Sequence, residues 1–258
     1  MSGFDRTVQA SKTKLLAIAK SVFRAMGLEI SFADTVATER NILRGLFKSY
    51  PFGFVLDVGA NTGQYGALVR NCGYRGPIVS FEPLLAAYDE LTQRAASDPC
   101  WTVADRGALG AAAGHATINV AGNSASSSLL DMNPVHASAA PHSAYVAMEQ
   151  IKVYVLDDCI ERYVGDKRCG LLKIDTQGYE MEVLRGAQRT LSDRIIAVQT
   201  ELSLIELYRG QPLMLDVCDF MRKHGFSLHQ IIPGFKDPAS GRLLQLDGIF
   251  AKDTAVPS

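Results

Sequence analysis

The stretch Phe54-Val-Leu-Asp-Val-Gly-Ala-Asn-Thr-Gly-Gln-Tyr65 decides the fold of this chain. It opens with an apolar run around Asp57 that is rich in Val and Leu, which is typical of a buried strand in a parallel sheet. Gly59 and Gly63 then permit a tight turn, because glycine adopts backbone conformations that other residues avoid. A helical pattern follows the turn. The stretch therefore predicts the strand–turn–helix unit at which open α/β sheets bind nucleotides.

The turn differs from the dinucleotide-binding pattern G-x-G-x-x-G, since Ala60, Asn61 and Thr62 occupy its centre. The missing central glycine disfavours a pyrophosphate, and the turn carries no Lys or Arg to meet phosphates. A ligand with an adenosine but no phosphate fits better, and S-adenosylmethionine (SAM) is the obvious one. The residues of this unit that we expect to contact SAM are Asp57, Gly59, Ala60, Asn61, Gly63 and Tyr65.

Acidic residues follow the next two predicted strands. Residues 78–81 lead to Glu82, roughly 20 residues past the turn, where a carboxylate can accept hydrogen bonds from both ribose hydroxyls. Pro83 stops the strand, because proline cannot donate to a ladder, and is expected beside the cofactor. Residues 101–104 lead to Asp105, which could reach the adenine or a neighbouring loop. These acids could instead cap helices or face water, but together with the glycine turn they favour a cofactor site.

Five sequence blocks resemble the FkbM-type methyltransferases in order and spacing. They are VLDVGANTGQY from Val55, FEP from Phe81, ALG from Ala108, LKIDTQGYE from Leu172 and VLRGA from Val183. The resemblance covers about residues 52–252, and the last two blocks are its most specific part. It implies SAM-dependent methylation of a hydroxyl group, often on a sugar of a glycolipid, glycopeptidolipid or macrolide-type natural product. Gln177 stands where Glu is frequent and Gln199-Thr-Glu precedes the last acidic motif, which leaves the acceptor open.

Strands and helices alternate along the rest of the chain. Further strands are predicted over 115–120, 151–156, 171–175, 195–202, 227–232 and 248–251, with helices over 32–48, 179–191 and 214–224. We therefore predict an α/β, Rossmann-like class I methyltransferase fold. The resemblance supplies a mostly parallel seven-stranded sheet of order 3-2-1-4-5-7-6 with an antiparallel last strand. Residues 1–50 are predicted to form an N-terminal helical arm and residues 51–258 the methyltransferase domain.

Candidate catalytic carboxylates lie at the ends of predicted strands, outside which such sheets bind ligands. A hydroxyl acceptor gains from a base in hydrogen-bond reach, for which Asp175 is the first candidate and Glu201 the second. Glu180 is a third, although the helix dipole alone explains a carboxylate there. Asp247 opens the antiparallel last strand, so we expect it beside Glu201 and in contact with the acceptor. Alternatively, Asp175, Glu201 and Asp247 could hold a divalent ion such as Mg²⁺ that lowers the pKa of the hydroxyl.

Residues 122–145 are rich in Ser, contain two prolines and two histidines, and carry almost no charge. Long segments of this kind inside a domain are usually functional or disordered. We predict a mobile lid over the acceptor site, with Ser124 near the cofactor and His142 near the acceptor. A merely flexible loop is the alternative.

Residues 1–30 hold five basic and two acidic residues, a net charge of +3, and apolar residues recur at helical spacing. Such a basic amphipathic helix could lie on an anionic membrane that carries a lipid-linked acceptor. It could equally pack over the core or form a homodimer interface.

Composition agrees with an ordinary enzyme, at 47% hydrophobic residues and a net charge of −1. No basic footprint indicates a nucleic-acid partner, and five scattered cysteines without a C-x-x-C pair suit a reducing compartment. No apolar run approaches a membrane span, and no signal-peptide pattern is evident. We expect a cytoplasmic protein, with any contact at the inner face of the membrane made by residues 1–30. The alternatives are an NAD(P)-dependent Rossmann oxidoreductase and a non-catalytic SAM-binding adaptor at a membrane surface.

Overall fold

The structure is a computed structural model that describes residues 39–252. Of the arm predicted over residues 1–50, residues 1–38 lie outside these residues, and with them the start of the helix predicted over 32–48. The chain divides into two units, residues 1–41 and 42–258. The description that follows concerns the second unit and the helix that leads into it.

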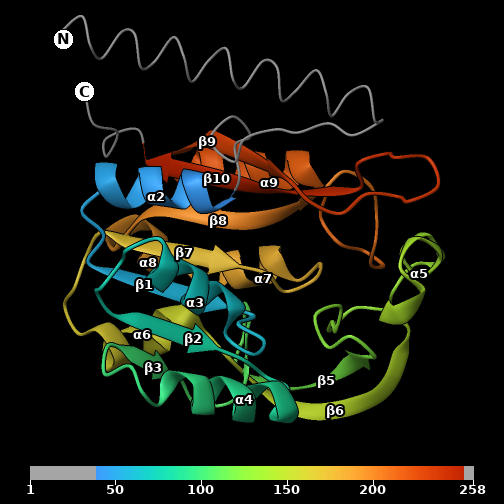
Figure 1. Cartoon of the computed structure of the whole chain (residues 1–258), viewed down its shortest axis with the longest axis horizontal. Helices are drawn as coiled ribbons and strands as arrows, with labels where there is room; N and C mark the ends of the chain where they lie inside the picture. The colour runs from blue at the N-terminus through green and yellow to red at the C-terminus, as the bar shows by residue number, and fades with distance from the viewer. Residues whose placement is uncertain (1–38, 253–258) are drawn as a thin grey trace, which may run out of the picture. The chain divides into compact units, whose positions relative to one another are not determined.

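Seven strands form the main sheet in the order β3-β2-β1-β7-β8-β10-β9 (Figure 1). The pairs from β3 to β8 are parallel, whereas β10 runs antiparallel to both β8 and β9. This confirms the predicted class I fold, its strand order and its antiparallel last strand. The bounds are β1 Phe54–Val58, β2 Ile78–Phe81, β3 Trp101–Val103, β7 Gly170–Ile174, β8 Ile195–Ser203, β9 Phe226–Pro233 and β10 Gln245–Lys252.

Helices cover both faces of the sheet, so the central strands are buried on two sides. In β1 every residue is buried, with Leu56 facing one helical layer and Val55 the other. This explains why the strand is a continuous apolar run rather than an alternating one. One layer holds α6 Leu156–Val164, α7 Glu180–Arg185, α8 Gln188–Asp193 and α9 Met214–Lys223; the other holds α2 Glu39–Ser49, α3 Gln64–Asn71 and α4 Leu85–Ala95.

The single helix predicted over 179–191 is wrong, because the chain forms two short helices, α7 and α8, instead. The break falls at Gly186, which packs directly against another backbone segment. A Cβ atom there would lie 2.1 Å from the carbonyl oxygen of Gly110. The helical periodicity of the sequence carries no sign of this contact, which joins residues far apart in the chain.

A second, three-stranded sheet has the order β4-β6-β5 (Figure 1). Its strands are β4 Ala108–Leu109, β5 Gly114–Ala121 and β6 Tyr145–Tyr154, and between β5 and β6 lie α5 Pro134–Ala139 and the 3₁₀ helix η1 Pro141–Ser143. The predicted strands over 115–120 and 151–156 are therefore present but lie outside the main sheet. Alternation of apolar residues predicts that a segment is a strand, but it does not predict which strand it pairs with. The segment from 122 to 145 is thus the connection of an antiparallel pair.

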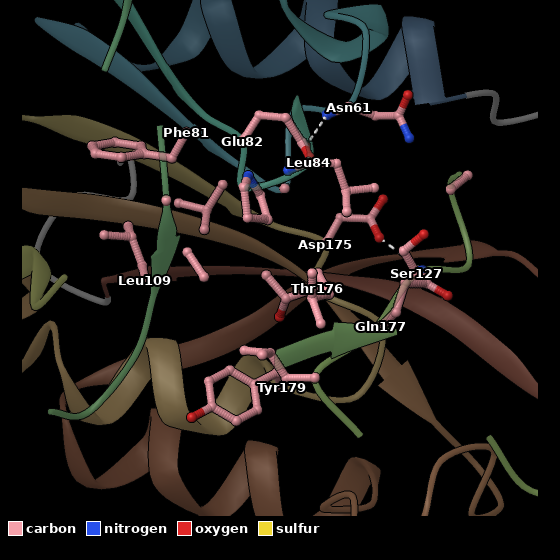
Figure 2. Close-up of a pocket in the computed structure, with 18 of the residues that line it drawn as sticks. Asn61, Phe81, Glu82, Leu84, Leu109, Ser127, Asp175, Thr176, Gln177 and Tyr179 are labelled. Carbon is pink, nitrogen blue, oxygen red and sulfur yellow. Dashed lines mark hydrogen bonds between the residues drawn. The ribbon is translucent and has the colours of Figure 1, made fainter. Parts of the chain in front are cut away.

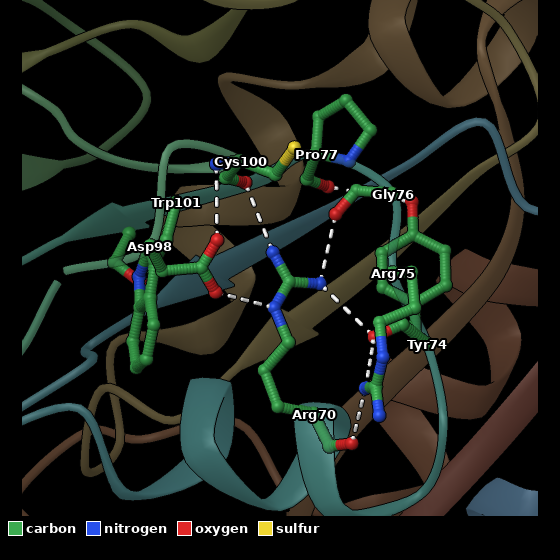
Figure 3. A network of polar contacts seen from close by, with 9 residues as sticks. Arg70, Tyr74, Arg75, Gly76, Pro77, Asp98, Cys100 and Trp101 are labelled. Carbon is green, nitrogen blue, oxygen red and sulfur yellow. Dashed lines mark hydrogen bonds and ion pairs between the residues drawn. The ribbon is translucent and has the colours of Figure 1, made fainter.

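Arg70, near the end of α3, joins the loops that precede β2 and β3 (Figure 3). Its guanidinium donates to the Asp98 carboxylate at 2.6 Å and to three backbone carbonyls: Tyr74 at 3.2 Å, Gly76 at 2.8 Å and Cys100 at 3.1 Å. Asp98 in turn accepts the backbone N–H of Cys100 at 3.0 Å. Since a planar guanidinium presents five donors in fixed directions, one side chain can hold three carbonyls of two loops together.

Trp101, at the start of β3, packs across α3. A Cβ atom on Gly66 would lie 2.1 Å from the indole ring, so the helix approaches the tryptophan only because residue 66 has no side chain. Within the described range, 39–252, no helix is long and apolar enough to span a membrane.

Gly66→Ala is expected to destabilise the protein by about 1–3 kcal/mol, because the added methyl group forces the buried indole of Trp101 to move. Gly45→Ala is the matched control, since a Cβ at this helical position in α2 would meet nothing within 4 Å. The control should stabilise the protein by about 0.5–1 kcal/mol through helix propensity. Chemical denaturation of both variants measures the difference, and equal effects would contradict the packing argument.

Candidate functional site

A cleft of about 670 Å³, part of it open to solvent, lies at the carboxyl ends of β1, β2 and β7 (Figure 2). Six of the predicted site residues line it: Gly59, Asn61, Glu82, Pro83, Ser124 and Asp175.

The glycine turn forms one wall of the cleft and depends on the close approach of two backbones. Gly59 has φ of 76°, and a Cβ there would lie 1.9 Å from the carbonyl oxygen of Asp175. The N–H groups of Gly59 and Ala60 both donate to the carbonyl of Phe81 at 3.0 Å. Gly63, with φ of 85°, lets the chain enter α3. Ala60 and Gly63 therefore shape the turn, and neither lines the cleft.

Glu82 is held in place by the backbone on both sides (Figure 2). One carboxylate oxygen accepts the N–H of Asn61 at 2.7 Å and the other that of Leu84 at 2.9 Å. Burial raises the pKa of Glu82 to about 7, against the opposing effect of these two hydrogen bonds. Because each carboxylate oxygen has two lone pairs, both can still accept a hydroxyl.

The wall beside Glu82 is apolar. It is formed by Phe81, Leu84, Leu109, Ile118 and Leu129. Among residues 39–252, no Lys or Arg lines the cleft. An apolar slot next to a carboxylate fits an adenosine, with the base in the slot and the ribose diol on Glu82, and offers nothing to a phosphate. The residues present therefore fit SAM.

Asp57 does not line the cleft but supports the turn from within the core. It accepts a hydrogen bond from the Ser80 hydroxyl at 3.2 Å, and Ser80 accepts one from the Trp101 indole at 3.0 Å. Burial raises the pKa of Asp57 to about 7. Tyr65 is likewise buried outside the cleft, where its hydroxyl donates to Gln199 at 2.9 Å. Their expected direct contact with SAM is corrected to support of the residues that line the cleft.

Asp175 lies at the opposite end of the cleft from the apolar slot, directly after β7 (Figure 2). The buried ammonium group of Lys173 lies 3.2 Å from its Oδ2 atom. Burial acts to raise the pKa of Asp175, but Lys173 and a hydrogen bond from Gln177 outweigh it and hold the pKa below its usual range. Burial also acts to lower the pKa of Lys173, and the surrounding carboxylates, Asp175 foremost, raise it overall. Asp175 is therefore an ionised carboxylate that faces the cleft.

Glu201 reaches this region without lining the cleft. The side-chain amide of Gln177 donates to Glu201 Oε2 and to Asp175 Oδ1, at 2.8 Å each. Burial, and next the charge of Asp175, raise the pKa of Glu201 well above its usual value. Asp247 on β10 is the cross-strand neighbour of Glu201 on β8, as the predicted topology requires. Its carboxylate accepts a hydrogen bond from Gln199 at 3.2 Å.

Three other predicted site residues lie outside the cleft lining, and two of them have structural partners. Glu180 accepts hydrogen bonds from the N–H groups of Thr176 at 2.9 Å and Gly178 at 3.0 Å, so it caps the turn before α7. Asp105 forms an exposed ion pair with Arg162 and points away from the cleft. His142 is exposed on η1, outside the cleft lining. Their positions outside the lining do not support the expected roles as base, adenine contact and acceptor contact, which stay predictions.

The magnesium alternative finds no support in the geometry. Among residues 39–252, no group of three or more His, Cys, Asp or Glu side chains is arranged to hold a metal ion. Asp175 and Glu201 are occupied by the Gln177 amide, and Asp247 by Gln199.

We call the part of the cleft around Asp175 and Glu201 its acidic end. The residues that organise this end were not identified from the sequence. Gln177 was noted only as a departure from a common glutamate, and Lys173 only as part of a motif. A lysine inside a continuous apolar strand was a usable signal, since buried ammonium groups require a partner. Tyr208, whose hydroxyl donates to Gln177 at 2.8 Å, lies in a loop and gave no such signal.

Comparison with known proteins agrees with this site. A family model for the methyltransferase FkbM domain matches residues 57–228. A search of curated proteins finds no match. Among solved structures, an FkbM methyltransferase from Methylobacillus flagellatus KT is 15% identical with a TM-score of 0.43, and the match covers 76% of this chain and 43% of that one.

Two further structures are similar at the same level. A TehB-like SAM-dependent methyltransferase from Corynebacterium glutamicum is 12% identical (TM-score 0.39; 95% of this chain, 100% of that one). An rRNA methylase from Streptococcus thermophilus is 9% identical (TM-score 0.42; 83% and 93%). Likeness this low says nothing about the acceptor. The family model, by contrast, matches well over half of the chain, which therefore belongs to the FkbM family of SAM-dependent methyltransferases.

Proposed function

We propose that this protein transfers the methyl group of SAM to a hydroxyl group, in particular a sugar hydroxyl of a glycolipid, glycopeptidolipid or related secondary metabolite. The observation that carries the proposal is Asp175: an ionised carboxylate that faces the cleft across from the apolar slot for adenosine. A hydroxyl is a weak nucleophile at neutral pH and gains from such a base within hydrogen-bond reach.

SAM, when bound, supplies an already activated methyl group on its sulfonium. The protein then has to place the acceptor oxygen in line with that methyl group and receive the hydroxyl proton. Asp175 would receive the proton.

The charge of the acidic end also favours an uncharged polyol. The carboxylates of Glu82 and Asp175 face the cleft, with Glu201 and Asp247 behind Gln177. Lys173, the cation in this group, is buried against Asp175. Such a surface repels phosphates and offers acceptors for sugar hydroxyls. This argues against a nucleic-acid acceptor.

Two rival functions make different predictions for ligand binding. An NAD(P)-dependent oxidoreductase would be stabilised thermally by NAD(P) rather than by SAM, and the cleft offers no basic residue for a pyrophosphate. A non-catalytic adaptor would bind SAM but form no S-adenosylhomocysteine (SAH) with any acceptor extract. The ionised Asp175 at the reacting end of the cleft favours an enzyme over an adaptor.

Glu82→Gln should weaken binding of SAH by roughly 1–3 kcal/mol, because two hydrogen bonds from the ribose lose a charged acceptor. Burial raises the pKa of Glu82 to about 7, so the carboxylate ionises as pH rises through neutrality. Wild-type affinity should therefore increase from about pH 6 to about pH 8, and the variant should lose most of that increase. Calorimetry with Glu90→Gln, an exposed site on α4, is the control. Unchanged affinity in Glu82→Gln would remove Glu82 from the site.

Asp175→Asn should retain SAH binding and lower turnover by about 10²–10⁴-fold, since the acceptor proton loses its base. Turnover is measured as SAH formed with an extract of cell-envelope glycolipids from a strain that lacks the gene. The matched control is Asp89→Asn, an exposed aspartate on α4. Near-normal turnover in both Asp175→Asn and Glu201→Gln would contradict a carboxylate base at this end of the cleft.

We further propose that residues 1–30 bring the enzyme to an anionic membrane that carries the acceptor; their net charge of +3 supports this. Deletion of residues 1–30 should then abolish co-sedimentation with vesicles that contain anionic lipid, while SAH formation with a soluble acceptor persists. Equal sedimentation of both forms would instead favour packing against the core or a homodimer, which analytical ultracentrifugation distinguishes.

A further inference from the structure

The side chain of Gln177 lies between the carboxyl groups of Asp175 and Glu201 at the acidic end of the cleft. Its backbone adopts φ of 54°, in the left-handed region that few non-glycine residues occupy. Its amide nitrogen donates to Asp175 and to Glu201, at 2.8 Å in both cases, and its amide oxygen accepts from Tyr208 at 2.8 Å. Both N–H groups of the side chain and one lone pair of its oxygen are thus used by three different residues.

These partners permit only one orientation of the amide. The ionised carboxylate of Asp175 can only accept, so it requires the NH₂ group of the amide, and the amide oxygen then faces the phenol, which donates to it. Tyr208 is itself fully buried, and its ring packs edge-on against His136 with 5.1 Å between ring centres. Its hydroxyl lies 2.8 Å from the Gln177 oxygen and 3.2 Å from the carbonyl of Ser126, so it cannot move without losing both.

We propose that Gln177 is a positioning residue for methyl transfer, whose amide holds the Asp175 and Glu201 carboxyl groups side by side and keeps the base aimed into the cleft. Tyr208 fixes the orientation of that amide. The inference rests on the proposed function, in which Asp175 receives the acceptor proton. In this chain the amide of Gln177 has two hydrogens to donate to the Asp175 and Glu201 carboxyl groups, whereas an ionised carboxylate at residue 177 would have none.

The amide also contributes to a difference between the pKa values of the two carboxyl groups. Burial and the charge of Asp175 raise the pKa of Glu201, while Lys173 and Gln177 keep the pKa of Asp175 low. The two carboxyl groups therefore differ in the direction in which their pKa values shift, and the lowered pKa of Asp175 leaves its carboxylate available as a base. The other charged groups that act on this pair are Asp57, Glu82, Glu180 and Asp247.

The test replaces the amide without changing its size. Gln177→Glu adds a third carboxyl group and removes both donated hydrogen bonds, whereas Tyr208→Phe removes only the hydroxyl that orients the amide. Gln188→Glu adds the same charge at an exposed position of α8 and is the matched control. Each full-length variant, labelled with ¹³C at its Asp and Glu carboxyl carbons and saturated with SAH, is titrated by NMR. Asp175→Asn and Glu201→Gln assign the two signals.

In Gln177→Glu, the titration midpoint of Asp175 should rise by at least about one pH unit, because a like charge replaces a hydrogen-bond donor. The acid limb of the pH–rate profile should move to higher pH with it. Tyr208→Phe should give a smaller rise in the same direction, and Gln188→Glu none. Thermal unfolding checks that the variants remain folded. Tyr208→Phe, which loses a single oxygen atom, tests the proposal even where Gln177→Glu does not fold.

If the titration midpoint of Asp175 is unchanged in both Gln177→Glu and Tyr208→Phe, the proposed role of Gln177 is overturned. This holds even if the wild-type protein is active on a glycolipid extract. If the Asp175 midpoint shifts in the two variants but the wild-type protein forms no SAH with such an extract, the role of Gln177 is retained. The proposed acceptor is then contradicted. The two proposals therefore fail separately.

Discussion

The whole site depends on how closely the backbone after β1 passes the backbone after β7. Gly59 and the carbonyl of Asp175 are so near that a single Cβ atom would lie 1.9 Å from that oxygen. The N–H of Asp175 also donates to the carbonyl of Val58 at 3.0 Å, which continues the parallel ladder beyond the two strands. This contact sets the distance between the glycine turn and the carboxylate of Asp175. It thereby fixes the spacing between the place for a cofactor and the place for a base.

The cleft has two chemically different ends, and different interactions hold the carboxyl groups at each end. At the adenosine end, apolar side chains surround one carboxylate whose oxygens are held by backbone N–H groups. At the acidic end, several carboxyl groups share one buried ammonium and one amide. Burying so much negative charge is costly unless it is paired, and the pairing determines which group keeps its proton. The fold supplies both ends because three parallel strands finish at one edge.

The sequence predicts the main sheet well and the site in part. Strand positions follow from continuous apolar runs, and acids at strand ends identified Glu82 and Asp175, which line the cleft. Asp105 and Glu180 carry the same sequence signal but pair with Arg162 and with backbone N–H groups. Proximity to a strand end does not determine where a side chain points. The second sheet, the break at Gly186 and the contact of Tyr208 with Gln177 all arise from packing between distant segments, which local patterns do not encode.

The position of β10 has a consequence for how the protein is assembled. This strand lies between β8 and β9, yet its residues are synthesised after both. Until residues 245–252 emerge, β9 has no partner in the sheet and β8 presents an open edge, the kind of edge that promotes aggregation. The adenosine end of the cleft needs β6 and β7 to hold its strands, so it can form once residue 175 has emerged, well before β10. A nascent chain could therefore hold a formed nucleotide slot while its sheet is still incomplete, and the insertion of one late strand ends that vulnerable interval.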